Sequence, residues 1–187
     1  MIASFLNSTP WLWPALALAV SVSLLAFRPL ARVLHAPRSV AFALLLGLGG
    51  IVALTVTPGP DAFLPVHYYR DCVVEIVRPI GFGRVLNLGE RGLNVLLFIP
   101  LGAGIGALPW SKAKGGLLVA GLVLPFAVEG IQYLVPALDR SCSSVDVIDN
   151  LTGLVVGLVV GVVVRLGLTL AGRAGGGGRT DEAGDRV

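Results

Sequence analysis

Two groups of polar residues, each within an otherwise apolar segment, have the types and spacing needed for chemistry. Glu129 and Gln132 are three residues apart, and Asp149 and Asn150 follow Asp146 by three and four residues. Residues at these spacings share one face of a helix. Grouped carboxylates and amides can transfer a proton, hold a divalent cation or bind a polar headgroup. These two groups are therefore the first candidates for a functional site.

Two more polar residues can join them. Asn94 opens another apolar segment, and Arg140 lies between the two groups in the chain, where it is the natural counter-charge and can bind a phosphate. Cys142 and Ser143 are close in sequence but have no base beside them, so the chain offers no convincing nucleophile. The residues leave open whether the protein is an enzyme, with Glu129 as acid or base, or only binds a ligand.

The composition determines which solvent surrounds the elements that carry these residues. The chain of 187 residues is 55% hydrophobic and 13% charged, and its mean hydropathy is +0.86. That is more apolar surface than a soluble domain of this size can bury, so membrane lipids are the expected surroundings. The basic residues are scattered between apolar segments, and no basic stripe indicates a nucleic-acid partner.

Five windows are long and apolar enough to cross a bilayer, which needs roughly 20 helical residues. They cover residues 10–27, 39–56, 93–108, 117–135 and 147–170. The sequence thus predicts an all-α fold, a polytopic transmembrane bundle of about five spanning helices in a domain over residues 1–171. Residues 57–92 form a long loop, and the Gly-rich residues 172–187 are expected to be a disordered cytoplasmic tail. The oligomeric state does not follow from the sequence.

The distribution of Lys and Arg predicts the orientation. Most of them lie on the inner side if the N-terminus is outside, so we expect a multi-pass protein of the cell membrane with a cytoplasmic C-terminus. No positive charge precedes the first window, whereas Arg28, Arg32 and Arg38 follow it, which favours a membrane anchor over a signal peptide. In this topology Glu129 lies in the outer third of a hydrocarbon core about 30 Å thick. At the opposite, inner face we expect no such polar group inside the spans.

The polar residues reach a similar depth from three helices, which favours one outward-facing site. Each also has a structural interpretation. Asp146 and Asp149 are suitable helix caps, and Glu129 and Gln132 can hydrogen-bond neighbouring helices. The face below the aspartates continues as Gly153, Gly157 and Gly161, where a second helix can approach closely.

The cysteines are interpreted from the same topology. Cys72 and Cys142 both fall on the outer side, where oxidising conditions permit a disulfide, although two unpaired thiols remain an alternative. The chain has neither a C-x-x-C motif nor a neighbouring pair of histidines, so no metal site of the zinc or iron–sulfur type and no cofactor are expected.

The polar residues also form a recognisable pattern. Asn94 begins the stretch NVLLFIPLG, Glu129 and Gln132 follow as E-x-x-Q, and Arg140 leads into D-x-x-D-N-x-x-G-x-x-x-G, which starts at Asp146. This pattern, over residues 94–161, resembles the VanZ-like family. One departure is the Ser-Cys-Ser-Ser insert after Arg140, which leaves the disulfide without support from the family.

The resemblance implies an integral membrane protein of the cell envelope, in a family named for a member linked to resistance to the glycopeptide teicoplanin. It selects as site residues Asn94, Glu129, Gln132, Arg140, Asp146, Asp149 and Asn150. We expect a binding protein with an outward-facing polar pocket for a lipid-linked or cell-wall-related molecule. The alternatives are an intramembrane enzyme acting on a lipid or cell-wall precursor, and a structural subunit of a membrane assembly.

Overall fold

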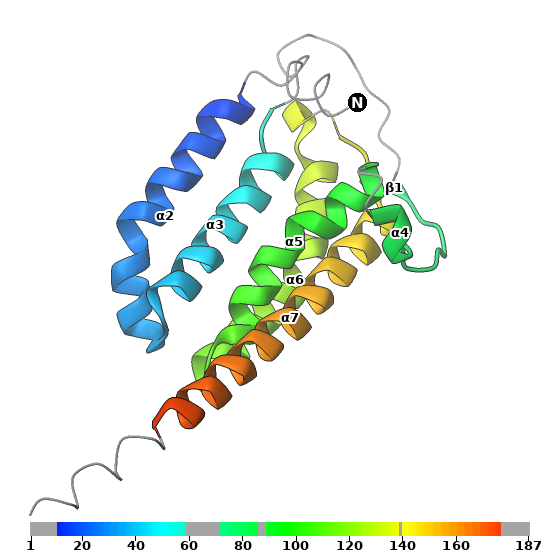
Figure 1. Ribbon diagram of the computed structural model, residues 1–187. Helices are drawn as coiled ribbons and strands as arrows, with labels where there is room; N and C mark the ends of the chain where they lie inside the picture. The colour runs from blue at the N-terminus through cyan, green and yellow to red at the C-terminus, as the bar shows by residue number, and fades with distance from the viewer. Residues whose placement is uncertain (1–10, 59–71, 86–88, 139, 177–187) are drawn as a thin grey trace, which may run out of the picture.

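The computed structural model describes residues 11–58, 72–85, 89–138 and 140–176 (Figure 1). Within these ranges the chain is mainly helical, which confirms the predicted all-α bundle. The long helices are α2 (Leu12–Leu34), α3 (Arg38–Thr55), α5 (Glu90–Ala107), α6 (Lys112–Leu134) and α7 (Ser144–Gly176). Short elements occupy the connections: strand β1 (Cys72–Val73), helix α4 (Phe82–Val85), the 3-10 turn η1 (Pro136–Leu138) and strand β2 (Cys142–Ser143).

Four helices, α2, α3, α6 and α7, are long and apolar enough to cross a membrane. The remaining long helix, α5, begins with the polar residues Glu90, Arg91 and Asn94, and these lower its hydropathy. It lies between α3 and α7 at the centre of the bundle (Figure 1). This arrangement is consistent with the predicted bundle of about five spans.

The helices differ from the predicted windows mainly at their ends. Helix α2 continues to Leu34, so Arg28 and Arg32 are helical and not in a loop. Helix α5 begins at Glu90, which puts Arg91 on the helix, one turn before Asn94. Helix α7 continues to Gly176, so residues 172–176 of the predicted tail are helical, and the rest of that tail lies outside the described residues.

Glycines on α7 bring that helix into backbone contact with α5. A Cβ atom added at Gly153 would overlap the Val95 carbonyl oxygen, and one added at Gly157 would overlap the Ile99 carbonyl oxygen and come within 2.8 Å of the Ala103 nitrogen. Such close approach needs glycine because any side chain would push the helices apart. The α5–α7 pair is the most extensive helix contact in the bundle.

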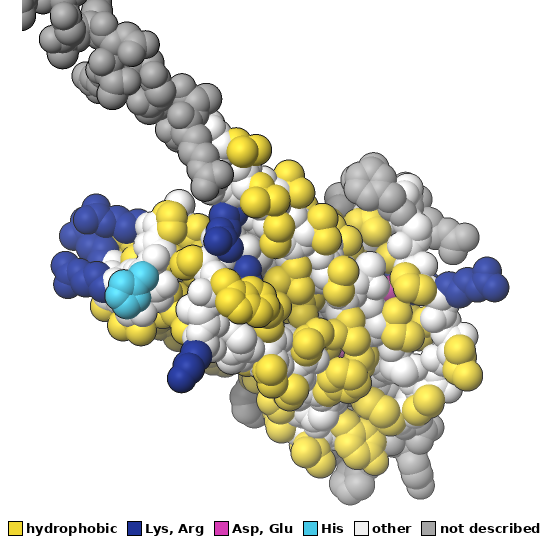
Figure 2. Space-filling model, turned by 90° about the horizontal axis from the view of Figure 1, so that it is seen from below, with side chains coloured by type: hydrophobic (Ala, Val, Ile, Leu, Met, Phe, Trp, Pro, Cys, Tyr) yellow, Lys and Arg dark blue, Asp and Glu magenta, His cyan; other side chains and the backbone are white. Residues whose placement is uncertain are grey.

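Apolar side chains fill the interior and also cover the outside. Phe98 and Ile105 of α5 pack with Ile51 of α3 and Leu154 of α7 in the core. Large apolar side chains remain exposed on every long helix, among them Leu25 at 80% and Leu168 at 69%. Figure 2 shows such side chains over much of the surface seen from below. A surface of this kind is suited to contact with lipid acyl chains.

The two ends of the bundle differ in charge. We call the end that carries β1 and β2 the strand end, and the opposite end the basic end. The described acidic residues are at the strand end: Glu75, Glu90, Glu129, Asp146 and Asp149. Figure 2 views the basic end, where dark blue Lys and Arg side chains gather near a cyan histidine. That end carries Arg28, Arg32, Arg38, Lys112, Lys114 and Arg165.

One cation at the basic end is buried within the bundle. Lys114 of α6 is buried, and its Nζ atom donates to the carbonyl oxygens of Gly106 at 3.1 Å and Leu108 at 3.0 Å. The Arg165 Nη1 atom also donates to the Leu108 oxygen, at 2.9 Å. The two cations thereby satisfy the carbonyl groups at the C-terminus of α5, where the helix dipole favours positive charge.

Candidate functional site

The predicted polar residues lie at the strand end, on α5, α6 and α7 and in the connection before α7 (Figure 1). We call the following residues the polar cluster: Arg91, Asn94, Glu129, Gln132, Arg140, Asp146, Asp149 and Asn150. Each helix presents them because its remaining faces pack against neighbouring helices or carry exposed apolar side chains. The cluster therefore lies where the packed part of the bundle meets the connections.

Asp149 is paired with Arg91, a residue that the sequence did not single out. Its side chain is fully buried, and its two carboxylate oxygens each accept a hydrogen bond of 2.7 Å from the guanidinium group. Arg91 also donates to the Arg78 carbonyl oxygen at 3.1 Å, which connects the pair to the segment before α4. A two-pronged contact of this kind fixes the relative position of α5 and α7.

Asp146 has a different environment, one turn closer to the start of α7. Its Oδ1 atom accepts a hydrogen bond of 2.7 Å from the Asn94 amide. The side chains of Asp146 and Asn94 are only half-buried. Arg140, also half-buried, acts electrostatically on Asp146 and on Glu129. Asp146 therefore contacts Asn94, whereas the guanidinium that binds Asp149 belongs to Arg91.

Glu129 holds the strand that precedes α7. Its side chain is buried, and its Oε2 atom accepts a hydrogen bond of 2.8 Å from the Ser143 backbone N–H. A disulfide joins the adjacent Cys142 to Cys72, and the two cysteines pair in the parallel ladder of β1 and β2. Glu129, β2 and the disulfide thus form one continuous connection at the strand end.

A second contact ties the segment just after β1 to the start of α7. The Ser144 hydroxyl accepts a hydrogen bond from the Glu75 N–H at 2.8 Å and donates to the Glu75 carbonyl oxygen at 2.9 Å. Together with the disulfide, this contact keeps the segment after residue 71 against the polar cluster. Parts of the long loop between α3 and α5, residues 59–71 and 86–88, lie outside the described residues.

The amide residues of the cluster have unequal partners. Gln132 is buried and donates from Nε2 to the Thr55 carbonyl oxygen at 3.1 Å, which satisfies the last turn of α3. Asn150 is also buried, and its Oδ1 atom has no hydrogen-bond donor among the described residues. An unmatched buried acceptor is costly, so Asn150 is where a bound water or ligand donor would be most favourable.

The cluster therefore has two layers. In the inner layer Glu129, Gln132 and Asp149 are buried and already hydrogen-bonded, so they connect the helices. In the outer layer Asn94, Arg140 and Asp146 are half-buried and combine amide, cation and carboxylate groups. Such a set can recognise a polar headgroup that carries both hydrogen-bond donors and a negative charge. In the described ranges no three metal-ligating side chains are grouped for a metal ion.

Sequence reasoning missed partners of two kinds. Arg91 was assigned to a loop, although its position one turn before Asn94 would have placed it on the same helix face. The Ser143 N–H and the Thr55 carbonyl are backbone groups that any residue carries, so side-chain patterns do not reveal them.

Comparison with known proteins identifies a matching family. A protein-family model described as VanZ/LLP1 matches residues 60–165, more than half of the chain, and this range includes every residue of the polar cluster. No curated protein and no solved structure matches the chain.

Proposed function

Because the chain belongs to the VanZ/LLP1 family, we propose that the outer layer of its polar cluster binds the headgroup of a lipid-linked or cell-wall-related molecule. Binding there contributes to resistance to glycopeptides of the teicoplanin type. The observation that carries the proposal is the half-buried hydrogen bond of 2.7 Å between Asn94 of α5 and Asp146 of α7, with the half-buried Arg140 in the connection before α7. Arg140 then binds an anionic group of the ligand, and Asp146 and Asn94 accept and donate hydrogen bonds.

The surroundings of the cluster suit a ligand with an apolar tail. Leu93 and Leu96 of α5 and Ile131 and Leu134 of α6 are exposed apolar side chains at the strand end. An acyl or prenyl chain can therefore remain in the bilayer while its headgroup contacts the outer layer. The proposal requires no reaction, because a protein that holds such a molecule also changes how a glycopeptide reaches it.

A structural role is the second candidate, and the inner layer favours it. Glu129 and Asp149 are buried and hydrogen-bonded to Ser143 and Arg91, so they stabilise the bundle whether or not a ligand binds. An intramembrane enzyme with Glu129 as acid or base has less support, because that carboxylate accepts a backbone N–H and no nucleophile with a base accompanies it among the described residues. Distinguishing these roles requires variants in both layers.

Variants of the outer layer test the binding proposal. We expect the wild-type protein to raise the minimum inhibitory concentration of teicoplanin in a susceptible host, and Arg140→Gln or Asp146→Asn to abolish that increase at unchanged membrane abundance. Loss of a hydrogen bond to a charged group costs about 1.5–3 kcal/mol, which lowers ligand affinity by about tenfold or more. Asn at position 146 still accepts from Asn94, so folding should be preserved.

The controls for this experiment lie in the inner layer and at the basic end. Glu129→Gln keeps an acceptor for the Ser143 N–H, and Lys112→Gln removes an exposed charge from the opposite end. Normal abundance and unchanged susceptibility in both Arg140→Gln and Asp146→Asn would contradict the binding proposal. Loss of accumulation in Glu129→Gln alone would assign Glu129 to the structural role.

We further propose that the strand end faces outward from the cell membrane, with the N-terminus outside and the C-terminus in the cytoplasm. The disulfide supports this orientation because disulfides persist in oxidising compartments. The cations of the basic end support it as well, since Lys and Arg are enriched on the cytoplasmic side.

Thiol labelling of intact cells tests the orientation. We expect a membrane-impermeant maleimide to label Cys72 and Cys142 only after a reductant is added, and to label Cys142 without reductant in the Cys72→Ser variant, since that variant frees the partner thiol. Labelling is read as a mass shift on a gel. If both thiols react only in permeabilised cells, the orientation is inverted.

A further inference from the structure

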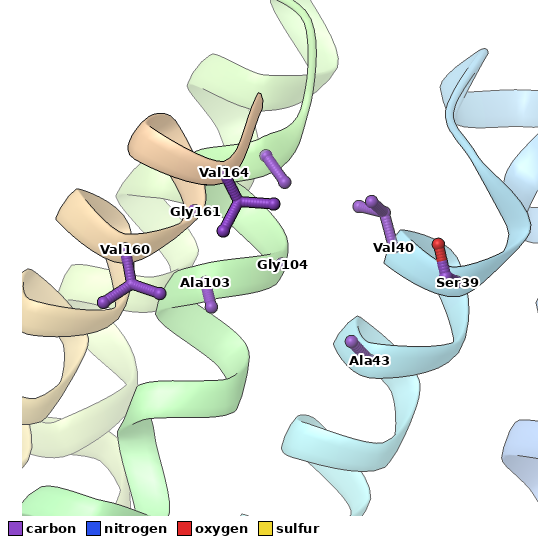
Figure 3. A pocket seen from close by; sticks show the side chains of 9 residues that line it. Ser39, Val40, Ala43, Ala103, Gly104, Val160, Gly161 and Val164 are labelled. Atoms are coloured by element: carbon purple, nitrogen blue, oxygen red, sulfur yellow. The ribbon is translucent and has the colours of Figure 1, made fainter. Parts of the chain in front are cut away.

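An apolar groove lies between α3 and the α5–α7 pair, toward the basic end. It has a volume of about 170 Å³ and is lined by Ser39, Val40 and Ala43 of α3, Ala103, Gly104 and Ala107 of α5, and Val160, Gly161 and Val164 of α7. Figure 3 shows these small side chains facing one another across the space between the helices. The groove exists because both walls carry Ala, Gly and Val in place of larger side chains.

Two cations adjoin lining residues of the groove on the side of the basic end. Arg38 immediately precedes the lining residue Ser39, and Arg165 immediately follows Val164. Arg165 is fixed there by its hydrogen bond to the Leu108 carbonyl oxygen, next to the lining residue Ala107. Arg38 is exposed, and no described residue accepts a hydrogen bond from it. The described acidic residues lie at the strand end, so none of them offsets this positive charge.

We propose that this groove is a binding site for an anionic phospholipid, with a segment of one acyl chain between α3 and α7 and the phosphate group at Arg38 and Arg165. This site is separate from the polar cluster, which lies at the other end of the bundle, and it does not depend on the proposed function.

The shape of the groove favours an acyl chain. A cavity of about 150 Å³ accommodates a benzene-sized apolar molecule, so a space of this volume holds a short segment of hydrocarbon chain and not a folded domain or a helix. Val160 and Val164 are also exposed, which leaves the groove open to the bilayer from the side. A lipid can therefore enter by lateral diffusion without leaving its leaflet.

The charge at the groove determines the class of headgroup. Each Lys or Arg near an anionic lipid surface contributes about 1 kcal/mol of attraction, equivalent to about fivefold in affinity. Phosphatidylglycerol carries a net negative charge and phosphatidylcholine does not, so the two lipids separate the contribution of the headgroup from that of the chain.

Native mass spectrometry of the full-length protein in detergent tests the proposal. With phosphatidylglycerol or phosphatidylcholine of identical chains added, we expect the protein to retain phosphatidylglycerol about fivefold or more in preference. Arg38→Gln should lower that preference about fivefold, and Ala43→Leu, which fills the groove, should reduce retention of both lipids. The controls are Lys112→Gln, an exposed cation that does not adjoin a lining residue, and Ala127→Leu, an exposed position on α6 away from the groove.

Several results would overturn the proposal. Equal retention of the two lipids by the wild type would show that the groove does not select an anionic headgroup. Unchanged lipid retention in Ala43→Leu would place the lipid outside the groove. Loss of the preference for phosphatidylglycerol in Lys112→Gln as well as in Arg38→Gln would attribute that preference to general surface charge. If inorganic phosphate bound with the same affinity as the lipid, the groove would be a site for anions and not for lipids. If the protein formed a dimer that Ala43→Leu dissociates, the groove would be an interface between two copies of the chain.

Discussion

Replacement of Arg91 with Gln should lower the free energy of unfolding by about 3–5 kcal/mol, because it leaves the fully buried Asp149 carboxylate without its cation. Removal of one partner from a buried pair is costly since the remaining charge keeps its desolvation penalty and loses its compensation. We expect a large drop in the melting temperature of the detergent-solubilised protein and in its abundance in the membrane. Thermal unfolding can be followed by tryptophan fluorescence.

The partner substitution makes this test specific. Asp149→Asn in the Arg91→Gln background removes the unpaired charge, so the double variant should recover a large part of the lost stability. Arg78→Gln is the matched control, because Arg78 is exposed and contributes only its backbone carbonyl to Arg91. If Arg91→Gln were no less stable than Arg78→Gln, the Arg91–Asp149 pair would not connect α5 to α7 as described.

Gly157→Leu should lower the free energy of unfolding by roughly 3 kcal/mol or more, which is the upper end of the range for overpacked cores. The expected loss is therefore comparable to that of Arg91→Gln. The added Cβ atom would meet three backbone atoms of α5, those of Ile99, Gly102 and Ala103, and backbone cannot move aside as a flexible side chain can. We expect Gly157→Leu to separate α5 from α7 and to prevent normal accumulation. The measurement is membrane abundance together with protease resistance.

Another glycine on the same helix provides the control. Nothing lies within 4 Å of a Cβ atom added at Gly167, so Gly167→Leu should accumulate normally. Leucine also has a higher helix propensity than glycine. Equal accumulation of Gly157→Leu and Gly167→Leu would contradict the close approach of α5 and α7.

The sequence predicted the helices well and their ends less well. A bilayer-length apolar window marks α3 without ambiguity, and it ended within one residue of the helix at both ends. The windows failed where charge continues a helix, as at Arg28 and Arg32 in α2 and at Arg91 in α5. Helices extend beyond the hydrocarbon core into the headgroup layer, where charged residues are well solvated, so hydropathy alone ends them too early.

At the polar cluster, helical spacing was informative and long-range pairing was not. The three-residue spacing of Asp146 and Asp149 indicated one shared face of α7, and in the structure this face meets α5, where the two residues contact Asn94 and Arg91. The choice between two nearby arginines as the partner of Asp149 depends on where α5 begins, a boundary that the windows misplaced. The role of Glu129 depends on a backbone N–H whose position is set by the fold of the connection before α7.

The disulfide between Cys72 and Cys142 spans 70 residues and encloses α4, α5 and α6 in one covalent ring, with α2, α3 and all of α7 outside it. A proteolytic cut within that ring leaves both fragments joined, so a nicked chain keeps its full mass on a non-reducing gel. A cut in the turn between α2 and α3 releases a fragment in either case. Comparison of the same digest on reducing and non-reducing gels therefore shows whether a protease cuts the chain inside or outside the ring.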